Sequence, residues 1–82
     1  MHYAACYGHD NIVKLLIDKT NIDIIDNDGW SALHLAVANN RLSTIKLLIS
    51  FGANINTKNN NDMSPLDTAK FFGYHDIIVL LS

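Results

Sequence analysis

Cysteine and proline are almost absent from this sequence, which contains one of each, Cys6 and Pro65. A single cysteine excludes an internal disulfide and fits a reducing compartment. No apolar run approaches the roughly 18 residues of a membrane-spanning helix. The first residues, Met1 to Ala4, also lack the basic start and apolar stretch of a secretory signal. These absences predict a cytoplasmic or otherwise intracellular protein that does not enter a membrane.

Charge of either sign is also scarce. Lysine and arginine number 6, aspartate and glutamate number 8, and the formal net charge is −2. A nucleic-acid-binding protein normally presents a basic face, so we expect no nucleic-acid partner. Hydrophobic residues make up 49% of the chain, which is typical of a globular rather than a disordered sequence. At 82 residues the chain is at most one small domain.

What the sequence does contain is one unit that occurs three times. Leu33 recurs as Leu66, and Leu47 recurs as Leu80, each 33 positions further along. A fixed period of about 33 residues is typical of stacked repeats in which each unit is a turn followed by two helices. We therefore expect a single domain over 1–82, with a partial repeat at about 1–25, a complete one at 26–58 and a partial one at 59–82.

The first helix of each unit has a recognisable start and end. Ser31 and Ser64 are favoured N-cap residues, and Pro65 suits the first helical position. Residues that tolerate the left-handed conformation at a helix end recur in register at Gly8, Asn40 and Gly73. Small residues that suit close helix packing recur at Ala4, Ala36 and Ala69.

The second helix of each unit is apolar over more than one face. Such a helix is expected to be sandwiched between neighbours rather than to lie on a surface. We expect the three to open at the polar residues Asn11, Ser43 and Asp76. In the last one, uncovered apolar side chains are expected at Ile77, Ile78, Leu80 and Leu81. Gly52 ends the middle one, whereas the first unit lacks that glycine, which predicts an irregular helix end at residues 19–21.

These residues closely resemble the ankyrin repeat, whose pattern contains Thr-Pro-Leu-His-x-Ala, a Gly-His turn, Ile-Val-x-Leu-Leu and Gly-Ala-Asp-Val-Asn. The matching segments are Ser31-Ala32-Leu33-His34-Leu35-Ala36, Gly8-His9 with Ile12-Val13-Lys14-Leu15-Leu16, and Gly52-Ala53-Asn54-Ile55-Asn56. Asp67 departs from the pattern at the position of its histidine. The resemblance implies an all-α ankyrin repeat solenoid of helix-turn-helix pairs linked by extended turns.

A metal or catalytic site has little support in the sequence. Cys6 and His9 have a ligand-like spacing, but Gly8 separates them and no second pair lies nearby. A Cys–His nucleophile pair would need a positioned base and an orienting group, and no loop here marks an oxyanion site. We expect no metal, no cofactor, no small-molecule substrate and no enzymatic activity.

The resemblance implies a protein–protein interaction module whose partner docks on a concave face of turn tips and first helices. Carried over position by position, the partner-binding residues would be Trp30, Met63, Tyr7, Phe71, Phe72, Asp28, Asn27, Asn60, Asn61 and Asn39. Tryptophan is the commonest hot-spot residue, so we expect Trp30 to be the anchor. Three alternatives stay open: Trp30 and Met63 only pack on the neighbouring turn, the chain is a targeting or regulatory segment of a larger enzyme or channel, or it is a spacer.

Overall fold

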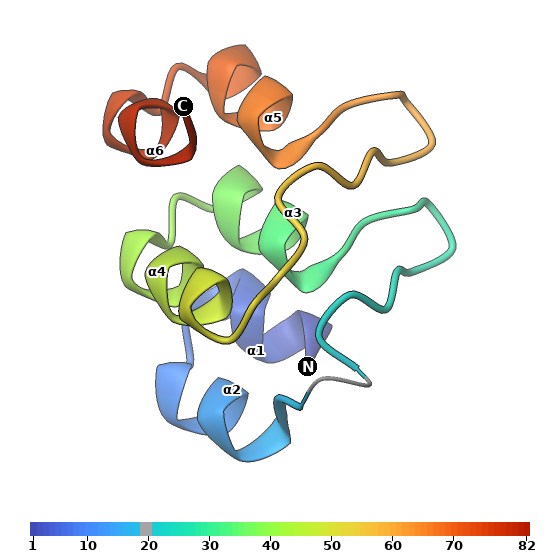
Figure 1. The fold of residues 1–82 in the computed structure, drawn as a ribbon, viewed down its shortest axis with the longest axis vertical. Coiled ribbons are helices and arrows are strands. Elements are labelled where there is room, and N and C mark those ends of the chain that lie inside the picture. The colour runs from blue at the N-terminus through green and yellow to red at the C-terminus, as the bar shows by residue number, and fades with distance from the viewer. Residues whose placement is uncertain (19–20) are drawn as a thin grey trace.

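The computed structural model describes residues 1–18 and 21–82, and this part of the chain forms six helices. In order they are α1 (His2–Tyr7), α2 (Asp10–Leu16), α3 (Ala32–Ala38), α4 (Leu42–Ser50), α5 (Pro65–Phe72) and α6 (His75–Leu81). Figure 1 shows three helix pairs stacked along the long axis, with α1, α3 and α5 in one layer and α2, α4 and α6 in the other. Within the described residues the only β-type pairing is an isolated antiparallel bridge between Ile25 and Ser31. The all-α stacked architecture predicted from the sequence is confirmed.

The first helices begin where the sequence predicts. Ser31 Oγ accepts a hydrogen bond from the backbone N–H of His34 at 3.2 Å, and the His34 side chain accepts from the backbone N–H of Ser31 at 3.3 Å. Ser64 and Asp67 repeat this reciprocal pair, with both distances 3.1 Å. Because two N-terminal amide groups are satisfied at once, the arrangement is a capping box, and both predicted N-caps are confirmed.

The predicted left-handed residues also have the expected backbone. Gly8, Asn40 and Gly73 have φ angles of 73°, 57° and 72°. Each reverses the chain between the first and second helix of its pair, and the second helix follows at once. Glycine or asparagine recurs at this position because the backbone must adopt a left-handed conformation there in each of the three units.

The prediction for the start of the second helices was wrong. They begin at Asp10, Leu42 and His75, each one residue earlier than expected, and their N-cap side chains make no capping hydrogen bond. The reason is the tight inter-helix turn. In the first pair the N–H of His9 donates to the carbonyl of Ala4 at 2.8 Å, while the His9 carbonyl accepts from Val13 at 3.0 Å. These backbone bonds position the helix start, so a polar side chain at the cap is not required.

The α2 helix ends without a glycine. Its C-cap, Ile17, is extended, with ψ 132°. The side-chain amide of Asn21 reaches back and donates to the carbonyl of Leu16 at 2.6 Å, which satisfies one of the free carbonyls at the helix end. The irregular end predicted at residues 19–21 is described here only for Asn21, since residues 19 and 20 lie outside the described part.

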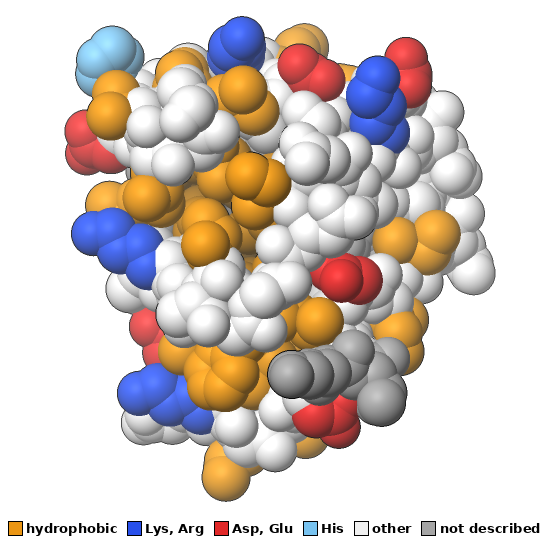
Figure 2. Space-filling view, in the orientation of Figure 1, with side chains coloured by type: hydrophobic (Ala, Val, Ile, Leu, Met, Phe, Trp, Pro, Cys, Tyr) orange, Lys and Arg blue, Asp and Glu red, His pale blue; other side chains and the backbone are white. Residues whose placement is uncertain are grey.

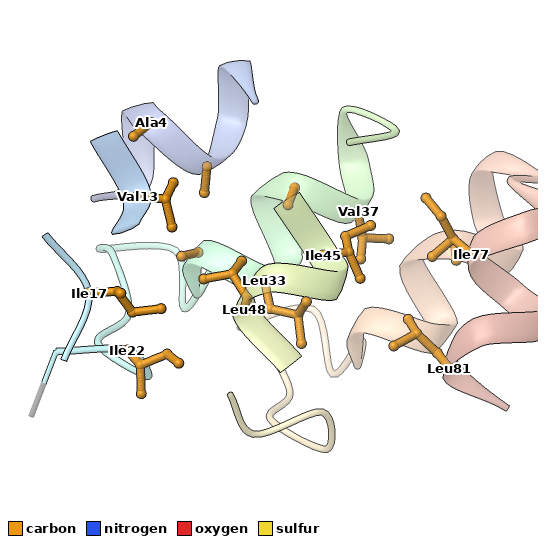
Figure 3. Packing of buried hydrophobic residues seen from close by; sticks show 14 residues of the cluster. Ala4, Val13, Ile17, Ile22, Leu33, Val37, Ile45, Leu48, Ile77 and Leu81 are labelled. Atoms are coloured by element: carbon orange, nitrogen blue, oxygen red, sulfur yellow. The ribbon is translucent and has the colours of Figure 1, made fainter. Parts of the chain in front are cut away.

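The core lies between the two helix layers (Figure 3). Val13, Ile45 and Ile77, one from each second helix, are fully buried, and Leu33 and Val37 of α3 pack among them. The small residues predicted to allow close packing are buried at Ala4, Ala36 and Ala69. Each unit therefore contributes both a short side chain that brings helices together and longer ones that fill the space between layers.

The expectation that every second helix is sandwiched holds for α4 but not for the end helices. Leu15 of α2 is 83% exposed. In α6 the prediction was wrong for Ile77 and Leu81, which are 0% and 8% exposed, whereas Val79 and Leu80 face outward. Residues four apart lie on one face of a helix, so residues 77 and 81 point inward together. Two of the four side chains that were expected to be uncovered are therefore buried, whereas Leu80 is exposed as expected.

Candidate protein-binding surface

Each turn between units is shaped by one side chain at its start. In the first turn, Asp26 Oδ1 accepts from the backbone N–H groups of Asp28 and Trp30, both at 2.9 Å. The N–H of Gly29 donates to the Asp26 carbonyl at 3.0 Å, and Gly29 has φ 81°. Asp26 thus holds the turn in the shape that presents Asp28 and Trp30.

The second turn repeats this design with an amide in place of the carboxylate. Asn59 Oδ1 accepts from the N–H groups of Asn61 at 2.9 Å and Met63 at 3.1 Å. Asp62 takes the place of the glycine, with φ 62°. The structural roles of Asp26 and Asn59 were not foreseen, although their spacing of one repeat is visible in the sequence.

The tips of the two turns are joined to each other. The N–H of Asn60 donates to the carbonyl of Asp28 at 3.0 Å, and the Asn60 side chain donates to the carbonyl of Asn27 at 3.2 Å. Gly29 lies buried beneath this contact. The structure therefore brings Asn27, Asp28 and Asn60, all predicted as binding residues, into one exposed cluster at the turn tips.

Two histidines connect the first helices to these turns. The His34 Nε2–H donates to the carbonyl of Met63 at 2.9 Å, and His2 Nε2 lies 3.2 Å from the carbonyl of Trp30. His34 is fully buried, and burial lowers the pKa of its imidazole, so the neutral form is favoured. His2 lies two residues before Ala4, as His34 lies two residues before Ala36. The repeat register therefore already indicated that His2 occupies the same position as His34.

Trp30 and Met63 are both partly buried. The Trp30 ring packs edge-on against the ring of His34, with 5.9 Å between centroids. Because His34 also bonds to Met63, these two predicted binding residues flank the same buried histidine. Trp30 thus has an internal packing role and retains some exposed surface.

The first helices carry exposed aromatic side chains. Tyr7 is 52% exposed and stacks on Tyr3, which is 78% exposed, with ring centroids 5.5 Å apart. Phe71 is 74% exposed, and Phe72 stacks on Tyr74 at 5.5 Å. Tyr3 was missed in the sequence analysis, although its spacing of four from Tyr7 places both on one helix face.

A groove of about 320 Å³ lies where α1 meets α3 and the first turn. The residues that line it are His2, Tyr3, Cys6, Tyr7, Asp26 and Leu35. Beside it, the Asn39 side-chain amide lies 3.2 Å from Cys6 Sγ and donates to the Leu35 carbonyl at 2.8 Å. The groove joins the aromatic surface of α1 to the polar turn.

Apolar exposure also occurs on the second helices. Figure 2 shows hydrophobic side chains gathered over this side, with basic and acidic side chains along its outer edge. A hollow of about 360 Å³ between α4 and α6 is lined by Leu42, Lys46, Asp76, Val79 and Leu80. Lys46 is exposed, as is its repeat counterpart Lys14.

Within residues 1–18 and 21–82, no three side chains of His, Cys, Asp or Glu gather in a way that could hold a metal ion. In the same part of the chain, every helix is too short or too polar to cross a membrane.

Comparison with known proteins places these features in a family. The family model described as ankyrin repeats (3 copies) matches residues 1–82. Zebrafish (Danio rerio) Notch-regulated ankyrin repeat-containing protein A is 38% identical over 73 residues, which is 89% of this chain and 65% of that protein.

Two longer relatives match over small parts of their length. Mouse synphilin-1 is 32% identical over 79 residues, 90% of this chain and 8% of that protein. Human transient receptor potential cation channel subfamily A member 1 is 35% identical over 72 residues, 84% of this chain and 6% of that protein. The chain thus spans less than two thirds of each of these three relatives. Because the family model matches its full length, this chain belongs to the ankyrin repeat family.

Proposed function

We propose that this chain binds another protein through its turn tips and the open side of its first helices. Ankyrin repeats in general are protein-interaction modules. The observation that carries the proposal is the set of exposed aromatic rings on α1 and α5: Tyr3, Tyr7, Phe71 and Phe72. Aromatic residues are enriched in the buried centres of interfaces, where their area leaves water without a large loss of side-chain entropy.

The proposal gives each predicted residue a part in binding. Trp30, with Met63 beside it, forms the anchor, and the exposed rings on α1 and α5 extend the apolar contact. Asp28 and Asn61 supply polar contacts at the turns. Asn39 and Asn60 already use their side-chain N–H groups within the chain, which leaves their Oδ1 atoms to accept from a partner. Asn27 completes the polar rim.

The proposed role is binding rather than catalysis. The family consists typically of non-enzymatic repeat proteins. Among the described residues, the hydrogen-bond partner of Cys6 Sγ is the side-chain amide of Asn39, which is not an acid or a base. The net charge of −2 favours a protein partner over a nucleic acid.

The test begins with affinity capture and mass spectrometry to obtain a partner, followed by calorimetry. Trp30→Ala should weaken binding by about 2 kcal/mol or more, the range of hot-spot residues. Because Trp30 also packs on His34, Tyr7→Ala provides a second variant with little structural role. Phe51→Ala is its matched control, since Phe51 is similarly exposed, at 47%, but follows α4 outside the proposed surface.

A loss of affinity in Trp30→Ala and Tyr7→Ala but not in Phe51→Ala, with circular dichroism spectra unchanged, would support the proposal. If Trp30→Ala lowers the melting temperature while both variants keep full affinity, this surface is not the binding face.

A second candidate role is that of a targeting or regulatory segment in a larger protein. The observation in its favour is that the chain matches only 8% and 6% of the two long relatives, one of which is a cation channel by name. The complete open reading frame distinguishes the two roles, because an appended catalytic or membrane domain would favour the second.

A further inference from the structure

The groove beside α1 combines aromatic walls with a single carboxylate. Tyr3 and Tyr7 lie along α1, Leu35 belongs to α3, and Asp26 starts the first turn. The volume of about 320 Å³ lies at the lower end of the range for ligand pockets, so the groove has room for one long side chain. Its walls are otherwise apolar, apart from His2, whose Nε2 is engaged by the carbonyl of Trp30.

The charge in this groove is negative. Asp26 Oδ1 accepts two backbone hydrogen bonds, but Oδ2 has no partner among the described residues. Asp23 and Asp28 lie in the same linking segment. Arg41, which donates from Nε to the carbonyl of Cys6 at 3.2 Å, does not line the groove. A purely apolar ligand would therefore cover a carboxylate oxygen without giving it a donor, which is unfavourable.

We propose that this groove binds an arginine side chain of the partner protein, a proposal that rests on the protein-binding function proposed above. The guanidinium group would stack on the ring of Tyr3 and donate to Asp26 Oδ2. Arginine fits better than lysine because its planar group stacks on aromatic rings and donates along fixed directions, whereas an ammonium group is compact and strongly hydrated. The aliphatic part of the side chain would lie against Leu35.

The second turn shows that the charge of Asp26 can be removed without changing the shape of the turn. Asn59 starts the second turn and accepts the same two amide hydrogen bonds through Oδ1. Asp26→Asn should therefore keep the turn and lose only the carboxylate charge. Asp62→Asn is the matched control, because it makes the same change in charge at the other turn. The Asp62 side chain forms an exposed ion pair with Lys58 at 3.6 Å, and its left-handed backbone tolerates asparagine.

The probe is the peptide acetyl-Gly-Arg-Gly-amide, compared with the same peptide containing citrulline, which has the same shape without the charge. Two-dimensional NMR of the isotope-labelled chain should show shifts of the Tyr3, Tyr7 and Leu35 amides with the arginine peptide. Asp26→Asn should weaken this binding up to about fivefold, the strength of an exposed ion pair, and Asp62→Asn should not change it. Tyr3→Leu should weaken binding about two- to fivefold, and Tyr3→Phe should retain it, because the aromatic ring is required.

Equal shifts with the citrulline peptide, shifts that map to another surface, or no shifts at all would overturn the arginine assignment. Equal affinity in Asp26→Asn and the parent would overturn it as well. None of these results affects the proposed protein-binding function, which is tested separately with the captured partner and the Trp30 and Tyr7 variants.

Discussion

Replacing His34 with glutamine should remove most of the dependence of stability on pH near neutrality. His34 is fully buried, its Nε2–H donates to Met63, and its Nδ1 accepts from the backbone N–H of Ser31. A proton added to the ring would place a charge in a buried site, and this desolvation outweighs the Met63 and Thr57 carbonyls and the Asp26 charge, which favour the imidazolium. The imidazole therefore prefers to be neutral in the folded state.

The sign follows from the lowered pKa of His34, whose first cause is desolvation. The unfolded chain takes up a proton near the ordinary pKa of about 6.5, whereas the folded chain does so only at lower pH. Stability is therefore complete above about pH 6.5 and decreases as the pH falls through the interval between the two pKa values. The slope cannot exceed about 1.4 kcal/mol per pH unit for one proton. One unit below 6.5, the loss is about 1.4 kcal/mol if the folded imidazole is still neutral.

The assay is urea denaturation followed by circular dichroism, repeated at several pH values between about 8 and 5. The parent should lose stability toward acid, and His34→Gln should show a flatter profile from a lower starting stability. His75→Gln replaces an exposed histidine and is the control, which should follow the parent. Hydrogen bonds from Thr44 and Ser64 lower the pKa values of Asp10 and Asp67. The stability that these two carboxylates contribute is lost only at lower pH, in the range where carboxylates take up protons. Identical profiles for the parent and His34→Gln would refute the assignment of His34 as a buried neutral residue.

Two further predictions concern the turns and metal independence. Gly29→Ala should destabilise the fold more than Gly52→Ala. Both sites have positive φ, which costs a side chain about 1–2 kcal/mol, but only at Gly29 would the new Cβ lie 2.8 Å from a backbone atom, the nitrogen of Asn60. Urea midpoints compare the two, and equal losses would mean that the turns do not pack as tightly as described. Metal removal should have no effect, so thermal melts with and without a strong chelator should overlay. A lower melting temperature with the chelator would contradict this.

The sequence determined the features that depend on a residue and its immediate neighbours. The N-caps at Ser31 and Ser64 and the left-handed turn at Asn40 were all predicted in place. Such features follow from steric limits on φ and from hydrogen bonds that span three or four residues. Because equivalent residues recur about 33 positions apart, a feature predicted in one unit could also be predicted in the next. The turn and first-helix locations of Trp30 and Tyr7 were predictable in the same way.

The tertiary structure decided what depends on residues far apart in the chain. The start of α2 was mispredicted because the bond from His9 to Ala4 outweighs the capping preference of Asn11. Ile77 was expected to be uncovered, but the rotation of α6 buries it against the preceding pair. The groove is lined by both Tyr3 of α1 and Asp26 of the first turn. The spacing of residues within a single element cannot indicate that two such side chains line one groove. Local steric rules specify each turn and helix end, whereas burial and the lining of a groove are set only when stacked units exclude water from one another.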